Sequence, residues 1–194
     1  IIENLLPIDE YPFIQKDHLS PRILWMRSFH EVYNPFMAVK AAAILSKKYP
    51  DFKMVMAGSD SGLLNKTKEL VNELGLQEQI IFPGYVDMNG KRKLADEYDI
   101  YINTNIVDNS PVSVIEFMAM GLPVIAANAG GLPYMITDKI NGLLCNSDDE
   151  NDLANKIQLL LNDPALSTLI RSNARKYAEN YDEKIVLEKW KKIL

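Results

Sequence analysis

Short apolar runs alternate with longer segments of mixed polarity along most of the chain. The short runs are rich in isoleucine, valine and methionine and are bounded by glycine, proline or charged residues, as is typical of buried strands. Alternating strands and helices predict an α/β fold, a Rossmann-like doubly wound parallel sheet covered on both faces. The predicted strands lie at residues 23–26, 52–57, 80–82, 100–103, 124–127 and 142–145. The predicted helices lie at residues 35–48, 62–74, 91–98, 111–120, 153–161, 165–181 and 183–194, with a turn or short helix near Met135.

The predicted helix at residues 111–120 is apolar on nearly every face, and Glu116 lies in its middle. A helix that is apolar all round is a buried helix, and a buried carboxylate is unfavourable unless it is paired or hydrogen-bonded. Glu116 is therefore expected to have a partner. Ser110 is the predicted N-cap, and Pro111 is the predicted first helical residue, where its missing N–H costs nothing.

The start of the same helix is a candidate anion site. The N–H groups of Val112 and Ser113 lack intrahelical acceptors and lie at the positive end of the helix dipole. Asp108 precedes the predicted cap, and Glu116 lies one turn further into the helix. An anion site with carboxylates beside it suits a ligand that carries phosphate and hydroxyl groups, such as a nucleotide sugar.

Four candidate site residues follow predicted strands, namely Arg27, Gly58, Tyr85 and Asp108. In an open parallel sheet, ligands bind at the C-terminal ends of the strands, near the point where the strand order reverses. These four residues are therefore expected to converge on one rim of the sheet.

Composition narrows the range of partners. The chain has 194 residues, of which 47% are hydrophobic, so one domain with a full-sized core is expected. Its net charge of −5 argues against nucleic acid or an anionic membrane as the main partner. The single cysteine, Cys145, allows no internal disulfide, and no apolar run approaches a membrane span, so a cytoplasmic location is expected. Because the chain begins with Ile1, it is expected to be part of a longer protein.

Several motifs, in order along the chain, carry a resemblance to a known family. The motifs I-L-W-M-R-S and F-K-M-V-M-A-G cover the first two predicted strands and the residues directly after them. The motif L-G-L-Q-E-Q-I-I-F-P-G-Y-V leads into the third predicted strand and continues through the turn after it. The apolar helix runs into M-A-M-G-L-P-V-I-A-A-N-A-G-G-L-P, which is a long and specific signature. With these motifs the chain resembles the C-terminal domain of GT-B-fold retaining glycosyltransferases of family 4, also called group 1. The resemblance covers nearly the whole chain.

The resemblance implies the donor-binding half of a two-domain enzyme. Residues 1–20 would be the linker from an N-terminal acceptor-binding domain, and residues 21–194 would be the donor nucleotide-sugar-binding domain with its C-terminal helices. The substrate would be a UDP- or GDP-linked sugar, transferred with retention, and neither a metal nor a separate cofactor is implied. This domain alone is expected to be inactive, and the missing domain could bring the protein to the inner face of the membrane.

The resemblance also implies roles for individual residues. Arg27 would contact the diphosphate, and Glu116 would hold the ribose hydroxyls. The backbone near Tyr85 and Val86 would bind the base, and the segment that begins at Asp108 would meet the donor sugar. The implied donor-binding residues are Arg27, Gly58, Tyr85, Val86, Asn109, Ser110, Val112, Ser113 and Glu116, and the implied catalytic residues are Asp108 and Glu116.

Three positions depart from the family pattern. Asp108 is one methylene shorter than the usual glutamate, and Tyr134 replaces the usual acid after G-G-x-P. Val32 stands where the family has a lysine, so one cation is missing from the expected diphosphate site. Two other functions stay open. One is a nucleotide-sugar epimerase of the same fold, although the P-V-S-V-I-E-F-M-A-M-G signature favours the transferase. The other is a non-catalytic nucleotide-binding module, which the missing lysine favours. Fold alone does not decide between them.

The candidate residues also have simpler structural interpretations. Glu116 could pair with a buried arginine or backbone amides, Arg27 could be a surface ion-pair partner, and Asp108 could be a turn residue. Gly130 and Gly131 are interpreted as a tight turn that needs positive φ.

Four further polar residues are given no functional role. Lys91 and Lys93 are interpreted as solvated surface lysines. His18 and His30 are interpreted as loop residues, although histidine can titrate near neutral pH.

Overall fold

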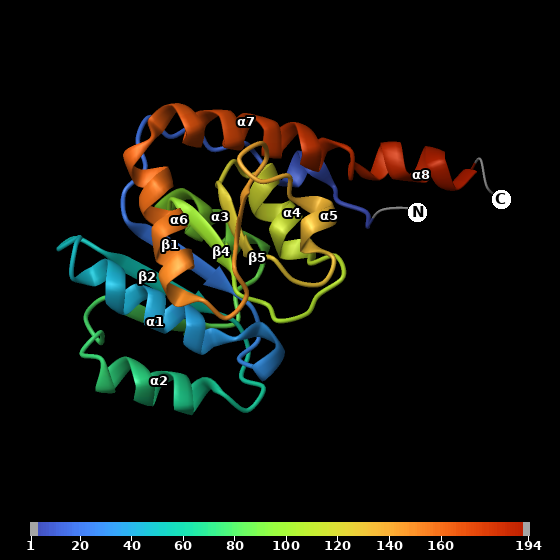
Figure 1. Ribbon diagram of the computed structural model, residues 1–194. Helices are drawn as coiled ribbons and strands as arrows, with labels where there is room; N and C mark the ends of the chain where they lie inside the picture. Colours follow the sequence, from blue (N-terminus) through green and yellow to red (C-terminus); the bar gives the residue numbers. More distant parts are fainter. Residues whose placement is uncertain (1–3, 192–194) are drawn as a thin grey trace.

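Six parallel strands form one sheet within residues 4–191, the part of the chain that the computed structural model describes (Figure 1). All the predicted strands are present, with ends close to the predicted ones. Residues 1–20, the linker in the prediction, are called the lead-in below. Residues 1–3 of this lead-in and residues 192–194 of the last predicted helix lie outside the described range. The strands are β1 (Arg22–Met26), β2 (Lys53–Ala57), β3 (Ile80–Gly84), β4 (Ile100–Asn103), β5 (Val124–Ala127) and β6 (Leu143–Cys145).

The order of the strands is β3-β2-β1-β4-β5-β6, so the chain builds outward from β1 and then returns to the other side of β1. Met26 of β1 is in register with Ala57 of β2, and Trp25 of β1 is in register with Ile102 of β4. The order therefore reverses between β1 and β4. This arrangement confirms the predicted Rossmann-like doubly wound sheet, in which ligands bind beside the reversal.

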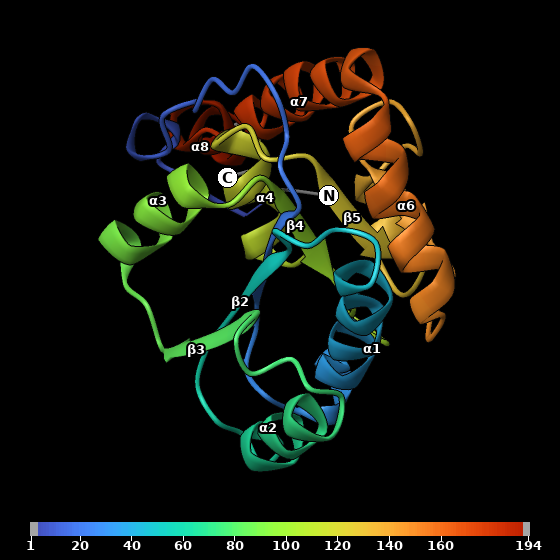
Figure 2. The same ribbon diagram turned by 90° about the vertical axis from the view of Figure 1, so that its left-hand side faces the viewer.

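Helices cover both faces of the sheet, as the alternating pattern predicts (Figure 2). The predicted helix ends shift slightly, and residues 88–90 join the helix predicted at 91–98. Two short 3-10 helices, η1 (Ile8–Glu10) and η2 (Glu31–Tyr33), were not predicted. The α-helices are α1 (Pro35–Ser46), α2 (Leu64–Glu73), α3 (Met88–Glu97), α4 (Val112–Ala119), α5 (Leu132–Met135), α6 (Glu150–Asn162), α7 (Pro164–Glu179) and α8 (Glu183–Lys191).

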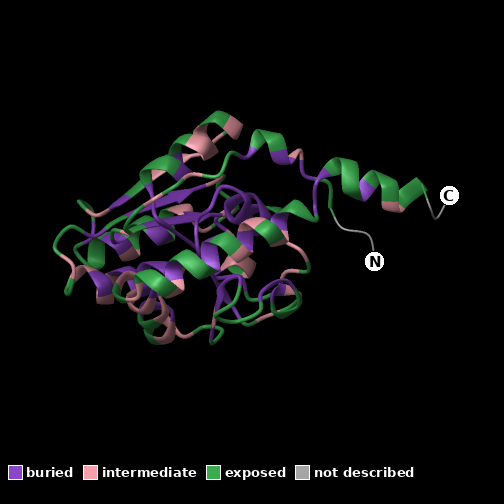
Figure 3. Ribbon diagram, turned by 90° about the horizontal axis from the view of Figure 1, so that it is seen from above, coloured by how far each residue is buried: buried purple, intermediate pink, exposed green. Residues whose placement is uncertain are grey.

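The hydrophobic core forms two layers, one on each face of the sheet. Leu24 and Met26 of β1 pack with the layer beneath α3, α4 and much of α7. Ile23 and Trp25 pack with the layer beneath α1, α2 and α6. Successive strand residues point to opposite faces, so a strand buried on both sides is apolar at every position. In Figure 3 the buried residues accordingly follow the strands and the inner sides of the helices.

The lead-in segment before β1 is held against α7 by two arginines. The buried Arg171 donates to the carbonyl oxygens of Ile14 and Lys16, each at 2.7 Å. Arg175 donates to the carbonyl oxygen of Tyr11 at 2.6 Å. Hydrogen bonds from charged groups are stronger than neutral ones, so they fix the path of this segment. The role of residues 1–20 as a linker between domains stays a prediction.

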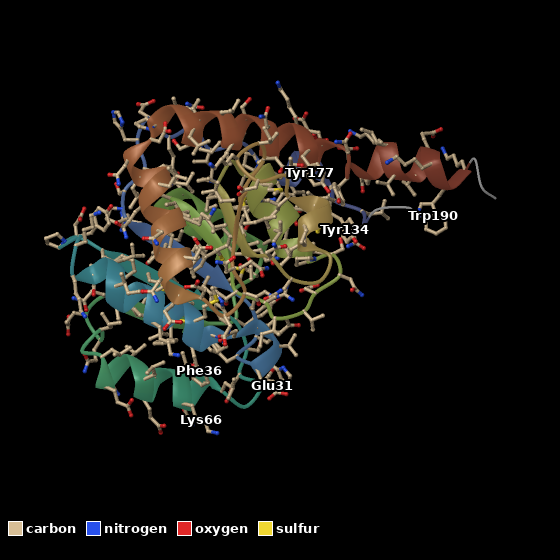
Figure 4. The ribbon with its side chains drawn as sticks, viewed as in Figure 1. Glu31, Phe36, Lys66, Tyr134, Tyr177 and Trp190 are labelled. Carbon is tan, nitrogen blue, oxygen red and sulfur yellow. The ribbon has the colours of Figure 1, made fainter. Side chains whose placement is uncertain are left out.

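The last described helix, α8, extends away from the body of the domain (Figures 1 and 3). Ile185, Leu187 and Trp190 are each 44–46% exposed on it, and the Trp190 side chain lies beside α8, clear of the domain (Figure 4). Among residues 4–191, no helix combines the length and the apolarity needed to cross a membrane.

Candidate functional site

A cavity of about 500 Å³ lies at the C-terminal ends of β1 and β2, beside the N-terminus of α4. This is the edge of the sheet next to the order reversal, where ligands of doubly wound sheets bind. Asn109 lies outside it and lines a smaller neighbouring cavity with Val32. The other predicted site residues all line the main cavity, namely Arg27, Gly58, Tyr85, Val86, Asp108, Ser110, Val112, Ser113 and Glu116.

The N-terminus of α4 has no side-chain cap. Pro111 is the N-cap residue, with an extended backbone (ψ 115°), and the helix begins at Val112. The prediction that Ser110 caps the helix and that Pro111 is its first residue is therefore wrong. Ser110 instead faces the lead-in, because the side-chain amide of Asn4 lies 3.4 Å from both oxygens of Ser110.

This uncapped end, a feature that α2 and α5 share, contrasts with four other helices of the domain. At α4, the N–H groups of Val112 and Ser113 have neither an intrahelical acceptor nor a side-chain acceptor among the described residues. An anion is the natural partner for such groups at the positive end of the dipole. The helices α1, α3, α6 and α7 are capped by the side chains of Asn34, Asp87, Asp149 and Asp163, respectively.

Glu116 is 4% exposed and has two partners among the described residues. The ammonium of Lys91 donates to both carboxylate oxygens, at 2.7 and 2.8 Å, and the hydroxyl of Tyr11 donates to Oε1 at 2.9 Å. Burial, followed by the negative charge of Glu116, raises the pKa of Tyr11, so the phenol stays a neutral hydrogen-bond donor. Glu116 thus has the partner that its burial predicts, and two side chains, a lysine and a tyrosine, fill this role.

Both partners were missed in the sequence. The interpretation of Lys91 as a solvated surface residue is wrong, because its side chain is 24% exposed and lines the cavity. Lys93, two residues on, fits that interpretation, with a side chain that is 76% exposed. Tyr11 lies in a segment without periodicity, far from Glu116 along the chain, so no local pattern indicates their contact.

Arg27 extends from the end of β1 into the same cavity. Its Nη2 atom donates to Asp108 Oδ2 at 2.7 Å, and its Nη1 atom lies 3.4 Å from Ser113 Oγ. The guanidinium carbon lies 4.1 Å from the ring centre of Tyr33, a cation–π contact. Its Nε atom is buried and has no hydrogen-bond partner among the described residues. The side chain is 16% exposed, so Arg27 is not an ordinary surface ion-pair partner.

Asp108 is held by its side chain and its backbone. Oδ2 also accepts a 2.7 Å hydrogen bond from the side-chain amide of Asn105. The carbonyl oxygen accepts from the N–H of Gly131 at 2.6 Å. These contacts are those of an ordered loop residue, and they place a carboxylate directly opposite Arg27.

A buried tyrosine supports the start of α4 from below. The hydroxyl of Tyr101 donates to Ser113 Oγ at 2.9 Å, and its ring stacks on Phe117 with centres 4.4 Å apart. Burial raises the pKa of Tyr101 to about 12, so it stays protonated at neutral pH. Ser113 is thereby fixed between Tyr101 and Arg27.

Glycines allow the backbones around the cavity to approach one another. A Cβ atom at Gly58, where φ is +147°, would overlap the carbonyl oxygen of Arg27. Gly130 has the positive φ expected of a tight turn (+57°), but Gly131 has not. A Cβ atom at Gly131 would instead overlap the carbonyl oxygen of Asn109. Gly131 is therefore needed for close packing rather than for its φ angle.

The remaining positions lie at the rim. Tyr85 is 77% exposed, and Val86 beside it is partly buried. Val32, which stands in place of the family lysine, lies in η2, and its N–H donates to the ring of His30 at 3.3 Å. Tyr134 is 90% exposed on α5 (Figure 4). Within the described part of the chain, no group of three or more His, Cys, Asp or Glu side chains is placed to hold a metal ion.

The doubly wound sheet and the cavity at its order reversal define an α/β domain of the Rossmann-like class. The sequence matches the profile of a known family, described as "Glycosyl transferases group 1", over residues 9–177. Because this match covers most of the chain, the chain belongs to the group 1 glycosyltransferase family.

Two relatives with curated descriptions are also described as glycosyltransferases. An uncharacterized glycosyltransferase of Haemophilus influenzae is 30% identical over 157 residues, which are 80% of this chain and 44% of that protein. An N,N'-diacetylbacillosaminyl-diphospho-undecaprenol alpha-1,3-N-acetylgalactosaminyltransferase of Campylobacter jejuni is 26% identical over 193 residues, 97% of this chain and 46% of the relative. The chain thus spans about half the length of the curated relatives it matches.

Solved structures share the fold. Anabaena HepE in complex with UDP superposes with a TM-score of 0.87 at 20% identity, over 99% of this chain and 56% of that chain. The C-terminal domain of the group 1 family protein LpcC from Francisella tularensis superposes with a TM-score of 0.79 at 24% identity, over 91% of this chain and 98% of that one. This chain therefore has the fold of a glycosyltransferase C-terminal domain.

Proposed function

We propose that this chain is the donor-binding domain of a glycosyltransferase that transfers a sugar from a nucleotide sugar to an acceptor with retention of configuration. One observation carries the proposal. A guanidinium, an uncapped helix N-terminus and a buried carboxylate line one cavity at the order reversal of the sheet. These groups complement a diphosphate and a ribose in one ligand.

The diphosphate would bind Arg27 and the N–H groups of Val112 and Ser113. The guanidinium supplies a full positive charge, and the start of α4 supplies two N–H groups and the positive end of a dipole. When the sugar leaves, negative charge grows on the diphosphate. Groups that are already aimed at this charge stabilise the transition state without reorganising.

The nucleoside would extend from the diphosphate toward β3. Glu116 would accept a hydrogen bond from the ribose, and the backbone near Tyr85 and Val86 would contact the base. UDP in the complex of HepE supports a uridine nucleotide, and GDP stays open for this chain.

The sugar would lie near Asp108, Asn109 and Ser110, with Asp108 and Glu116 as the proposed catalytic residues. The acceptor would come from an N-terminal domain, with residues 1–20 as the linker to it. Support comes from the partial coverage of the relatives and from the match to a C-terminal domain. A cleft enzyme must hold its reacting groups together, so this chain alone should bind nucleotide but transfer no sugar.

The test is calorimetry of the purified chain with UDP, GDP and ADP, followed by incubation with the matching nucleotide sugars. One nucleoside diphosphate should bind. When its nucleotide sugar is incubated with the chain and no acceptor, the sugar should not be epimerised. Failure of all three nucleotides to bind would contradict the proposal. A new epimer of the nucleotide sugar, detected by NMR, would favour an epimerase, and efficient transfer by this chain alone would contradict the need for a second domain.

A further inference from the structure

We propose that Lys91 is a positioning residue for the donor nucleotide: it fixes the carboxylate of Glu116 so that one remaining acceptor position takes one ribose hydroxyl. This inference rests on the proposed function, because it assigns the residue that prepares Glu116 for its ligand.

The chain brings Lys91 to the cavity through a tight entry into α3. Asp87 caps this helix by accepting from the N–H of Gly90 at 2.8 Å. A Cβ atom at Gly90 would lie only 2.9 Å from the Cβ atom of Val86, so the residue before Lys91 must be small. The first turn of α3 therefore packs closely against the rim segment after β3 and directs Lys91 toward Glu116.

The contact is a bridge rather than a single hydrogen bond. The ammonium of Lys91 lies 2.7 Å from Oε1 and 2.8 Å from Oε2 of Glu116, which belongs to a different helix. A bridging cation fixes the plane of the carboxylate. Glu116 is also buried, so the Lys91–Glu116 pair is less exposed to solvent than a second ion pair of α3. In that second pair, Lys93 and Glu97 lie 3.8 Å apart, one turn from each other on the helix.

Counting acceptor positions limits what Glu116 can still bind. An ionised carboxylate offers about four acceptor positions, two on each oxygen. Lys91 and Tyr11 together use both positions on Oε1, and Lys91 uses one on Oε2. The contacts of the described residues therefore leave one acceptor position free, and it is on Oε2. One ribose hydroxyl can donate there directly, and a second would have to displace Lys91.

The other ionisable groups around Glu116 do not replace Lys91. Tyr11 from the lead-in is a neutral donor, and Tyr101 from β4 donates to Ser113. Arg27 lines the same cavity, but its side-chain contacts among the described residues are with Asp108, Ser113 and the ring of Tyr33. Lys91 is thus the cation that contacts the Glu116 carboxylate within residues 4–191.

The experiment compares ribose discrimination among lysine variants of α3. The ligands are the nucleoside diphosphate that the wild type binds, UDP or GDP, and its 2′-deoxy and 3′-deoxy forms. The proteins are the wild type, Lys91→Met, Lys91→Arg and the control Lys93→Met, which removes an exposed lysine from the same helix. Calorimetry gives each Kd, and circular dichroism gives each Tm.

In the wild type and in Lys93→Met, one deoxy form should bind about tenfold more weakly than the ribonucleotide, and the other within about threefold. In Lys91→Met, the ribonucleotide should bind more weakly and the discrimination should fall below about threefold, because Glu116 is no longer fixed. Lys91→Arg keeps the charge and should restore the discrimination. A purely structural role would change the Tm without changing this ratio.

Several results would overturn the inference. Full discrimination in a folded Lys91→Met variant would remove Lys91 from ribose recognition, and equal weakening by both deoxy forms in the wild type would contradict the acceptor count. If Lys91→Met does not fold, Lys91→Gln takes its place with the same expectation. If the wild type binds none of the nucleotides, the proposed function fails as well, whereas binding without an effect of Lys91 rejects this inference alone.

Discussion

Arg27 donates a 2.7 Å hydrogen bond to Asp108 beside the cavity, so the cation proposed for the diphosphate is already paired with a carboxylate. The two side chains are 16% and 17% exposed, so solvent screens this pair only partly. A phosphate that reaches Arg27 must share the guanidinium with Asp108 or compete with it. Arg27 can share, because its fork presents five N–H donors and its buried Nε has no partner among the described residues.

Replacing Arg27 should weaken binding of the nucleoside diphosphate. Arg27→Ala removes the charged hydrogen bonds to the phosphates and should reduce the binding free energy by about 1.5–3 kcal/mol. The control is Arg22→Ala, which removes an arginine from the other end of β1, where it contacts Tyr98 rather than the cavity. Calorimetry with UDP and GDP measures the change. An unchanged affinity in Arg27→Ala would place the phosphates elsewhere.

Replacing Asp108 should have the opposite effect: it should strengthen binding of the nucleoside diphosphate, which carries no donor sugar. Asp108→Asn keeps the shape and a carbonyl oxygen for Asn105, but removes a negative charge next to the proposed phosphates. UDP or GDP should therefore bind severalfold more tightly, by up to about 1 kcal/mol, the usual range for a partly screened charge. Asp51→Asn, an exposed site, is the control. Weaker binding in Asp108→Asn would mean that Asp108 chiefly orients Arg27.

Gly58 should be required for steric reasons beyond its φ angle. Both Gly58 (φ +147°) and Gly62 (φ +104°) have backbones that disfavour side chains, but only at Gly58 would a Cβ atom meet neighbouring backbone within 4 Å. Gly58→Ala should therefore lower the free energy of unfolding by about 1–3 kcal/mol more than Gly62→Ala, the usual cost of overpacking. Urea denaturation of both variants measures the difference. Equal losses would show that the loop after β1 yields to the added methyl group.

The sequence predicts most of the fold because the buried strands and helices carry strong local patterns. The run from Val124 to Ala127 is apolar at every position, and the structure buries all of it in the sheet. The wrong cap at Ser110 has a local cause, because proline is compatible with both the N-cap and the first helical position. Only the backbone angle of Pro111 decides between them.

The site was less predictable, because its contacts join distant segments. Lys91 lies on a helix with a polar composition, where only Leu94 and Ala95 are buried, so its sequence looks like a solvated face. Its contact with Glu116 depends on how α3 packs beside α4, which no local pattern encodes. Tyr11 depends in the same way on the arginines of α7 that hold the lead-in.

Glu116 is the residue that best separates a binding role from a structural one. Glu116→Gln keeps the shape of the side chain but replaces one acceptor oxygen with an NH₂ group, which cannot accept from a hydroxyl. It also leaves the Lys91 ammonium without its counter-charge. Both roles therefore predict a loss of stability, of about 1–3 kcal/mol for a buried group that loses its partner. The Tm alone does not distinguish them.

Nucleotide affinity does distinguish them. If Glu116 accepts a ribose hydroxyl, Glu116→Gln should weaken binding of the nucleoside diphosphate about tenfold, or about 1.4 kcal/mol. A deoxy form that binds weakly to the wild type should lose little further affinity in the variant, because two changes to one contact are not additive. Glu97→Gln, an exposed carboxylate on α3, is the matched control. If Glu116→Gln lowers the Tm but binds the ribonucleotide and both deoxy forms as the wild type does, Glu116 is a structural carboxylate that only pairs with Lys91 and Tyr11.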